Sequence, residues 1–251
     1  MAPTRPNLPA PAPGDAAPCG YDHLRALMSR QTGDEKHDSA STSTLDVLWV
    51  LYDRVLRLSP DTIRDDDRDR FYLSKGHGPM AYYAVLAAKG FIRTDQLDGF
   101  GGFDSILGHH PDRNLVPGAE ISSGSLGHGL PLAVGTALGL RAQRLAGHVW
   151  VLVGDGELDE GSNHEAIAYA GRAGLDNLHA VVIDNSSATY GWPGGIDARF
   201  ALEGWSALRV SGRDHGALEA AFTAAHPSRP HLVVAELETA QNWPRVLLAQ
   251  G

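Results

Sequence analysis

The chain has 251 residues and a formal net charge of −9, and its length fits one large domain that can bury a stable core. The negative charge argues against wholesale binding to nucleic acid or to an anionic membrane, and no apolar run is long enough to span a bilayer. Cys19 is the single cysteine, so no disulfide can form within the chain, as is typical of a reducing compartment. Because its start lacks a secretory signal pattern, we expect a soluble, cytoplasmic protein.

Residues 1–20 are rich in proline and alanine. This composition predicts a disordered arm, with docking onto a partner as the alternative. We expect residues 21–251 to form a single domain. A short helix is predicted over 21–29, and a second helix begins near Ser43 or Thr44, either of which can cap it. The apolar stripe of that second helix comprises Leu45, Leu48, Trp49, Tyr52, Val55 and Leu56.

The mixed-charge run that ends at residue 70, IRDDDRDR, predicts a solvated loop. A short strand, Phe71–Leu73, leads from it into the turn Ser74-Lys75-Gly76-His77-Gly78. The helix expected next, Met80–Ala88, stops before Gly90, a natural residue to follow a helix. A histidine between two glycines has little packing to do in such a turn, so His77 is a candidate site residue.

Residues 104–120 contain glycine, two prolines and asparagine, which predicts a loop. A glycine-rich turn, ISSGSLGHG at 121–129, and a long helix over 130–145 follow it. The chain after residue 195 predicts a helix, a glycine turn, a strand over 206–210, a helix over 216–225 and a last strand over 231–236. His215 is expected to cap or pack beside the last of these helices.

The chain is organised around residues 148–195. An apolar run, Val149–Val153, stops at Gly154-Asp155-Gly156, and a second run over 178–183 ends on Asp184-Asn185, with a predicted helix over 160–173 between them. A strand–helix–strand crossover places both strand ends at one edge of a parallel sheet, where ligands of open α/β sheets bind.

Asp155 and Asn185 should therefore lie side by side. Carboxylate and amide oxygens suit a hard cation such as Mg²⁺, which fills its remaining coordination positions with phosphate oxygens and water. Gly154 and Gly156 allow the backbone to approach a phosphate closely.

Several motifs within this segment together resemble the transketolase family: GDG at 154–156, EG at 160–161, HEA at 164–166 and DN at 184–185. The segment RFYLSKGHGPMAYYAVLAAKGFI also resembles its transketolase counterpart, and the resemblance covers roughly residues 21 to 236. It implies an α/β fold with a mostly parallel central sheet and helices on both faces. It also implies that the cofactor is thiamine diphosphate, with Mg²⁺, or Ca²⁺ or Mn²⁺ in its place.

The resemblance assigns roles residue by residue. The metal ligands would be the Asp155 carboxylate, the Asn185 side-chain oxygen and a backbone carbonyl near Ser187. The cofactor-binding residues would be His77, Gly124, Ser125, Leu126, Gly154, Asp155, Gly156, Glu157 and Asn185. His37, His77 and His110 would act in catalysis, with His37 and His110 on the substrate, and Glu160 would lie at the interface between subunits.

Three of these assignments have alternatives in the sequence itself. His37 could be a solvated loop residue, since its neighbours depart from the family motif. The adjacent pair His109-His110 could be metal ligands, although neighbours in a loop rarely converge on one ion. Glu160 could simply be a helix-start carboxylate, favoured there by the helix dipole.

The chain ends before the pyrimidine-binding domain that supplies an activating glutamate in transketolases. It thus resembles the amino-terminal subunit of a split transketolase. This implies a chain that is inactive alone, a carboxy-terminal partner subunit with the missing domain, an α2β2 heterotetramer, and a small sugar or keto substrate. The expected reaction is the transfer of a two-carbon ketol unit from a ketose to an aldehyde.

Departures from the family pattern at Asp38-Ser39, at Ser186-Ser187 and around Glu238 fall where substrate is met. They leave open a specialised ketol- or acyl-transfer enzyme of secondary metabolism. The 2-oxo acid dehydrogenase components and deoxyxylulose phosphate synthase share the metal motif but fit the GHG and GSLGHG segments less well. A non-catalytic regulatory or scaffold paralogue is the alternative from another functional class, although a scaffold has no need of a metal–diphosphate constellation.

Overall fold

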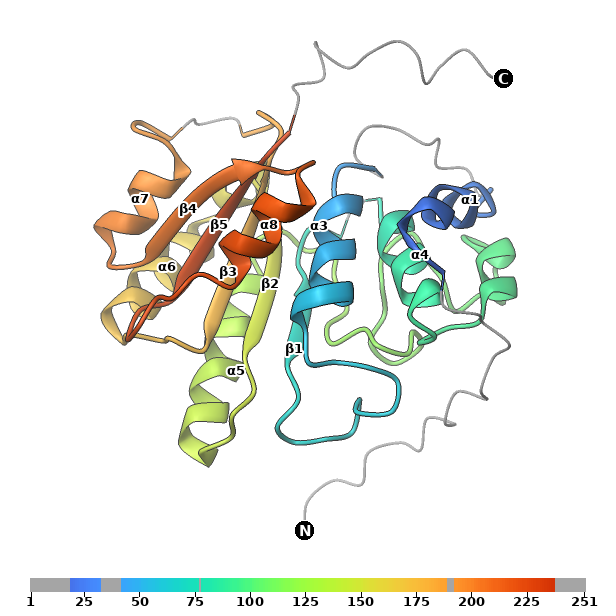
Figure 1. The fold of residues 1–251 in the computed structure, drawn as a ribbon, viewed down its shortest axis with the longest axis horizontal. Coiled ribbons are helices and arrows are strands. Elements are labelled where there is room, and N and C mark those ends of the chain that lie inside the picture. Colours follow the sequence, from blue (N-terminus) through green and yellow to red (C-terminus); the bar gives the residue numbers. More distant parts are fainter. Residues whose placement is uncertain (1–18, 33–41, 77, 189–191, 238–251) are drawn as a thin grey trace.

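A sheet of five parallel strands forms the centre of the molecule in the computed structural model, which describes residues 19–32, 42–76, 78–188 and 192–237 (Figure 1). The strands are β1 (Arg70–Leu73), β2 (Val149–Gly154), β3 (Leu178–Asp184), β4 (Ser206–Ser211) and β5 (His231–Glu236), and they lie in the order β1-β2-β3-β5-β4. Every neighbouring pair is parallel. The predicted α/β class with a parallel sheet is therefore confirmed.

The central crossover is the one predicted from the sequence. Strand β2 pairs with β3 in parallel, with Gly154 opposite Ile183, and the helix α6 (Gly161–Arg172) connects them. All six residues of β2 are buried, which explains its continuous apolar run. Asp155 and Asn185 consequently follow neighbouring strand ends at one edge of the sheet.

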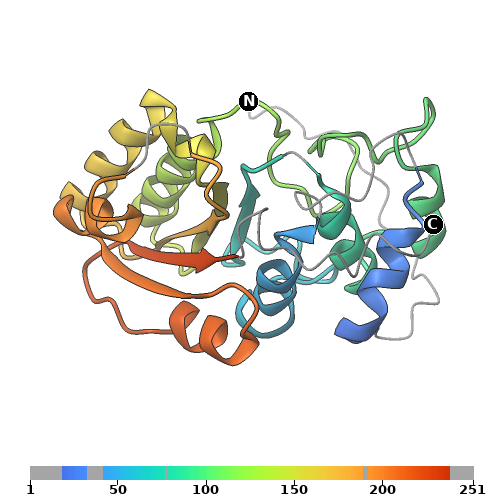
Figure 2. The same cartoon turned by 90° about the horizontal axis from the view of Figure 1, so that it is seen from above.

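Helices cover both faces of the sheet, and alternate residues of the strands face alternate layers. Trp150 and Leu152 of β2 pack with the first layer of helices, whereas Val149, Val151 and Val153 pack with the second. The first layer contains α3 (Leu45–Val50) and α8 (His215–Phe222), and α4 (Met80–Ala88) packs against α3 beyond β1; the second layer contains α5 (Gly129–Gln143), α6 and α7 (Ile196–Leu202). Figure 2 shows the sheet between these layers.

The amino-terminal helices differ from the predicted continuous segments. The first is a 3₁₀ turn, Tyr21–His23, followed by α1 (Leu24–Ser29). Helix α3 passes into a π-helical turn, Leu51–Val55, rather than continuing as an α-helix. Thr44 stands at the N-cap position of α3 as expected, but its side chain makes no capping hydrogen bond.

Helix α4 has the predicted bounds, and Gly90 follows it with a φ of +78°. Helix α8 begins at His215, one residue earlier than predicted, because the Asp214 carboxylate caps it by accepting from the Ala217 N–H at 3.0 Å. A 3₁₀ turn, η3 (Thr94–Gly99), is an element that the sequence pattern did not predict.

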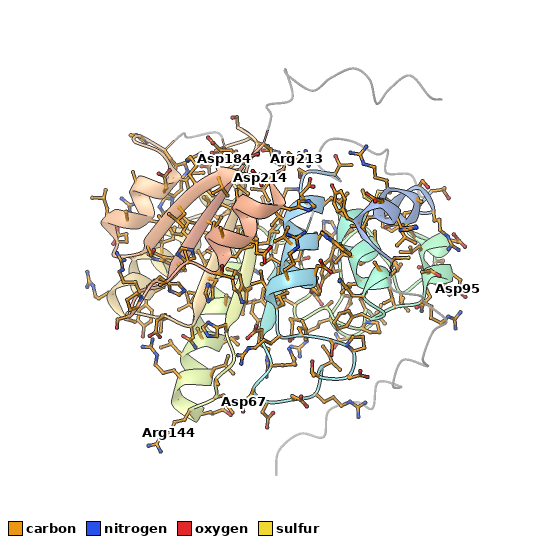
Figure 3. The ribbon with its side chains drawn as sticks, in the orientation of Figure 1. Asp67, Asp95, Arg144, Asp184, Arg213 and Asp214 are labelled. Atoms are coloured by element: carbon orange, nitrogen blue, oxygen red, sulfur yellow. The ribbon has the colours of Figure 1, made fainter. Side chains whose placement is uncertain are left out.

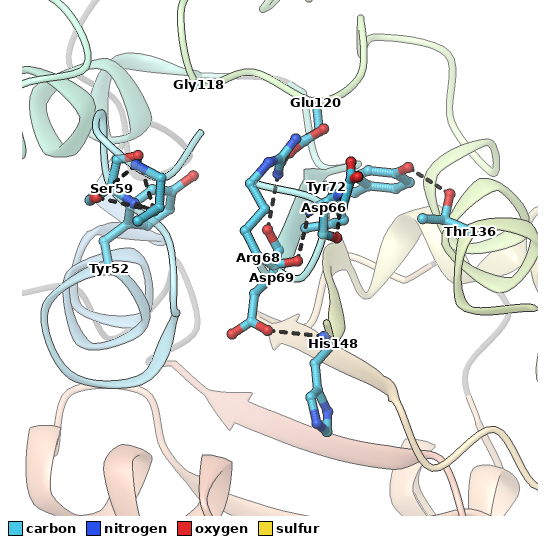
Figure 4. Close-up of polar contacts among 12 residues, drawn as sticks. Tyr52, Ser59, Asp66, Arg68, Asp69, Tyr72, Gly118, Glu120, Thr136 and His148 are labelled. Atoms are coloured by element: carbon cyan, nitrogen blue, oxygen red, sulfur yellow. Dashed lines mark hydrogen bonds and ion pairs between the residues drawn. The ribbon is translucent and has the colours of Figure 1, made fainter. Parts of the chain in front are cut away.

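The prediction that the charged run before β1 is wholly solvated is wrong for its last residues. Asp69 is 3% exposed, and its carboxylate accepts from the backbone N–H groups of Arg57 and His148, both at 2.9 Å. Arg68 forms a largely buried ion pair with Glu120 (Figure 4). These residues tie the loop to the amino-terminal ends of the strands, because a buried carboxylate requires such donors.

The two edges of the sheet carry different groups. Asp184, Arg213 and Asp214 all lie toward the carboxyl ends of the strands, while Asp67 and Arg144 lie at the opposite end of the molecule (Figure 3). In the part of the chain that the structure describes, no helix has the length and apolar character needed to cross a membrane.

Candidate cofactor site

Asp155 is the buried centre of the candidate site. It follows β2 directly, is 1% exposed, and starts the 3₁₀ turn η4 (Gly156–Asp159). Its Oδ1 accepts from the Gly156 N–H at 2.9 Å and from the Ser187 hydroxyl, and its Oδ2 accepts from the N–H groups of Ser187 at 2.6 Å and Ala188 at 3.2 Å. These donors hold the carboxylate toward the loop that follows β3.

Asn185 and Ser187 bring further oxygens to the same place. The Asn185 Oδ1 atom is buried and has no hydrogen-bond partner among the described residues. A Cβ at position 156 would lie 3.4 Å from the Ser187 carbonyl oxygen, so this carbonyl faces Gly156. A buried amide oxygen without a donor is costly unless a ligand satisfies it, and a hard cation prefers this set of oxygens. The residues therefore fit a divalent cation.

Two glycine turns from elsewhere in the chain meet beside this edge. A Cβ at Gly76 would lie 2.8 Å from the Gly124 nitrogen, so the turn after β1 touches the turn before α5. Gly124 has a φ of +122°, a conformation that favours glycine, and a Cβ there would lie 2.8 Å from Cδ2 of His110. The structure thus places the His110 ring against the glycine-rich turn.

The neighbouring histidine turns elsewhere. The His109 ring packs against Phe100, with centroids 5.4 Å apart, whereas His110 lies on Gly124. The two rings therefore contact different parts of the loop region.

Glu157 lies inside the protein instead of at its surface. It is 3% exposed, and its Oε1 accepts from the Ser74 hydroxyl and from the Gly127 N–H at 3.1 Å. Burial raises the pKa of Glu157, and the hydrogen bonds from Ser74, Gly127 and Gly154 oppose that rise. One carboxyl group therefore contacts both of the other turns.

Ser125, Leu126 and Glu160 are exposed beside these buried groups. Glu160 occupies the N-cap position of α6 without a side-chain capping bond, and its Cβ would lie 2.7 Å from a Cβ at Gly127. The Ser162 hydroxyl donates to the Gly127 carbonyl at 2.6 Å. The start of α6 and the glycine-rich turn thus form one continuous surface.

The predicted residues His37 and His77 lie outside the described residues, as do Asp38-Ser39 and Glu238. The other predicted site residues gather at the carboxyl edge of the sheet. Sequence reasoning missed Ser74, whose hydroxyl also accepts from the Gly129 N–H at 3.0 Å. Its place beside the SKGHG turn was the available signal.

Sequence reasoning also missed Arg209 of β4. Its guanidinium donates to Asp184 and Glu236, each at 2.9 Å, and to Asp197 at 2.8 Å. Asp184 and Glu236 end β3 and β5, and Asp197 is in the first turn of α7. Arg209 therefore holds together the strand ends next to Asn185.

Comparison with known proteins identifies the family of this chain. Residues 22–240 match the family model described as transketolase, thiamine diphosphate binding domain. The chain is 36% identical over 206 residues to one subunit of the apulose-4-phosphate transketolase of Actinobacillus succinogenes, and the match covers 79% of this chain and 75% of that protein. It is 35% identical over 184 residues to the 6-deoxy-6-sulfo-D-fructose transketolase subunit SqwG of a Clostridium species, covering 71% and 67%.

A further relative, ferredoxin fas2 of Rhodococcoides fascians, is 60% identical over 216 residues that cover 86% of this chain and 71% of that protein. The name ferredoxin does not describe this chain, because an iron–sulfur cluster takes about four cysteine thiolates and these 251 residues contain one cysteine.

Solved structures agree in fold. A Pichia stipitis transketolase variant superimposes with a TM-score of 0.73 at 26% identity, over 86% of this chain and 35% of that one. The chain thus spans about a third of the solved transketolase. The chain belongs to the transketolase family, as an amino-terminal subunit with the family's thiamine diphosphate-binding domain.

Proposed function

We propose that this chain is the amino-terminal subunit of a two-component transketolase that depends on thiamine diphosphate and Mg²⁺, with Ca²⁺ or Mn²⁺ able to replace the metal. Together with a carboxy-terminal subunit it transfers a two-carbon ketol unit from a ketose, or ketose phosphate, to an aldehyde. The observation that carries the proposal is the buried Oδ1 of Asn185, which has no hydrogen-bond partner among the described residues and follows the strand next to the one that ends at Asp155.

Each part of the chain has a defined task in this proposal. The Asp155 carboxylate, the Asn185 side-chain oxygen and the Ser187 carbonyl hold the metal, and the N–H groups after Gly154 face the diphosphate. His77 adds a donor to the diphosphate, and His37 and His110 bind the substrate. The chemistry that thiamine diphosphate supplies when bound is a nucleophilic carbon that accepts the ketol unit.

We propose that a second subunit carries the pyrimidine-binding domain, whose glutamate activates the cofactor in this family. Two relatives that are named as transketolase subunits support this arrangement. We propose an α2β2 heterotetramer in the cytoplasm, in which Glu160 lies at a subunit interface; its exposed position at the start of α6 is compatible with that role.

A specialised sugar is the second candidate for the substrate. The names of those relatives specify apulose 4-phosphate and 6-deoxy-6-sulfo-D-fructose, which differ from one another. In this chain, Ser186-Ser187 departs from the family pattern; Ser186 has a φ of +62°, and the Ser187 hydroxyl donates to Asp155. A panel of donor ketoses, with and without phosphate, distinguishes the two.

The test mixes the chain with its carboxy-terminal subunit, then measures ketol transfer and retention of thiamine diphosphate in Mg²⁺. Asp155→Ala should abolish both, because the metal loses its charged ligand. Asp95→Ala is the matched control, since Asp95 is exposed and lies far from this edge (Figure 3).

The isolated chain should show no steady turnover with cofactor and metal. Turnover by the chain alone, or full cofactor retention by Asp155→Ala, would contradict the proposal.

A further inference from the structure

One buried carboxylate connects the three turns that make up the candidate site. Glu157 is the second residue of η4, directly after Gly156, and its side chain enters the protein between the turn that follows β1 and the turn that precedes α5. It is 3% exposed. It is therefore almost completely buried, and its Oε1 atom contacts the other two turns.

Its hydrogen bonds form a short chain. The Ser74 hydroxyl donates to Oε1, and the same oxygen accepts from the Gly127 N–H at 3.1 Å. The Ser74 oxygen in turn accepts from the Gly129 N–H at 3.0 Å. Ser74 is 83 positions away in the sequence and Gly127 is 30 away, so these bonds connect distant segments.

The backbone of Glu157 is held from the other side. The Asn163 side-chain amide, on α6, donates to the Glu157 carbonyl at 2.6 Å, and Asn163 is fully buried. Hydrogen bonds therefore hold both the backbone carbonyl of Glu157 and its Oε1 atom. Hydrogen bonds to a charged acceptor are roughly twice as strong as neutral ones.

We infer that Glu157 is a positioning residue: through Ser74 and Gly127 it holds the turns at 74–76 and 124–129 beside Asp155, the proposed metal ligand, before the cofactor binds. It acts on the cofactor through these turns and not by touching it. This inference rests on the proposed function, since the site that it assembles is the thiamine diphosphate site.

Two substitutions of similar volume separate this role from simple packing. Glu157→Gln retains a side-chain oxygen that can accept from Ser74 and Gly127, whereas Glu157→Leu fills the space and accepts nothing. A packing role predicts that both variants behave alike. A positioning role predicts rescue by Gln only.

The experiment measures binding of thiamine diphosphate in Mg²⁺ by titration calorimetry, using the full chain mixed with its carboxy-terminal subunit. We expect Glu157→Leu to weaken binding about tenfold to a hundredfold, the range for bonds to a charged group, and Glu157→Gln to weaken it less than about threefold. Hydrogen exchange in the cofactor-free chain should speed up at the Gly127 and Gly129 amides in the Leu variant only.

The outcomes separate the two hypotheses. If the natural chain with its partner binds no thiamine diphosphate, the proposed function is wrong and this inference is overturned with it. If the natural chain binds and Glu157→Leu binds equally well, only the role of Glu157 is overturned. Should Glu157→Leu fail to fold, Ser74→Ala decides, because it removes the connection to Gly129 and keeps the carboxylate: a loss below twofold overturns the inference, and a larger loss supports it.

Discussion

At the scale of single residues, Gly124 shows how backbone conformation and side-chain contact can both require glycine. Its φ is +122°, and His110 lies where a Cβ would be. The consequence is that His110 rests on the turn that is proposed to bind the cofactor. A side chain at position 124 would have to displace either the turn or the imidazole.

Gly124→Ala should therefore destabilise the chain by about 1–3 kcal/mol, the cost of a non-glycine residue in such a conformation, as measured by urea unfolding. The His110 ring resonances should also move. Gly135→Ala is the matched control: Gly135 lies within α5 with no atom within 4 Å of the added Cβ, and alanine should stabilise the helix by about 0.5–1 kcal/mol. Equal effects of the two substitutions would refute the conformational argument.

At the scale of elements, Arg209 joins β3, β5 and α7 through three carboxylates. Asp184, Asp197 and Glu236 would repel one another without the guanidinium between them. Because Asp184 immediately precedes Asn185, the same contacts position the loop that carries a proposed metal ligand. Arginine suits this place, since its planar fork of donors reaches several acceptors at once.

Arg209→Met should lower the free energy of unfolding by about 1 kcal/mol, a value reduced for the partial exposure of the network, and should weaken Mg²⁺-dependent cofactor retention. Arg209→Lys should be intermediate. Arg64→Met, on the exposed part of the loop before β1, serves as the control. Cofactor retention that is unchanged in Arg209→Met would show that the network does not position Asn185.

At the scale of the whole molecule, the carboxyl and amino ends of the parallel strands carry different groups. The carboxyl edge carries the candidate site, and the amino edge carries a histidine cluster defined by His148, His179, His226 and His231. His148 Nδ1 and His179 Nε2 share a hydrogen bond of 2.8 Å, and His179 stacks on Trp150 with centroids 3.9 Å apart. His226 stacks on His231 at 4.7 Å.

Burial holds the pKa of His179 well below its usual value, and burial also lowers the pKa values of His148 and His231. The charged groups that face the cluster are Asp69, Asp176 and Arg57 near His148, and Arg229 near His231. The other three histidines also disfavour a positive charge on His179, so this buried ring is stable in its neutral form.

The sign of the pH dependence follows from these shifts. As the pH falls through about 6.5, the unfolded chain binds protons at His148, His179 and His231 that these residues do not bind in the folded chain, so stability decreases. We expect urea unfolding to lose up to about 1.4 kcal/mol per pH unit for each such histidine. His179→Phe, which retains a ring against Trp150, should reduce this slope; exposed His23→Gln is the control. A slope that His179→Phe leaves unchanged would contradict the assignment.

The crossover and its site were predictable because their signals are local. Apolar runs that stop at Asp155 and Asn185, with one helix between them, determine that both residues reach the same edge. The strand order was not predictable, because β5 inserts between β3 and β4 through pairings between distant segments. The burial of Asp69 was missed for a similar reason, as its partners Arg57 and His148 come from other parts of the chain.

The sequence by itself determined the family, the parallel crossover and the residues that end its strands, since each follows from neighbouring residues. Only the tertiary structure decided that Glu157 points inward to Ser74 and Gly127, that His110 rests on Gly124, and that Arg209 joins three strand and helix ends. Such contacts depend on how three turns close against one another, and a buried polar group takes whichever partner the folded chain brings within hydrogen-bond distance.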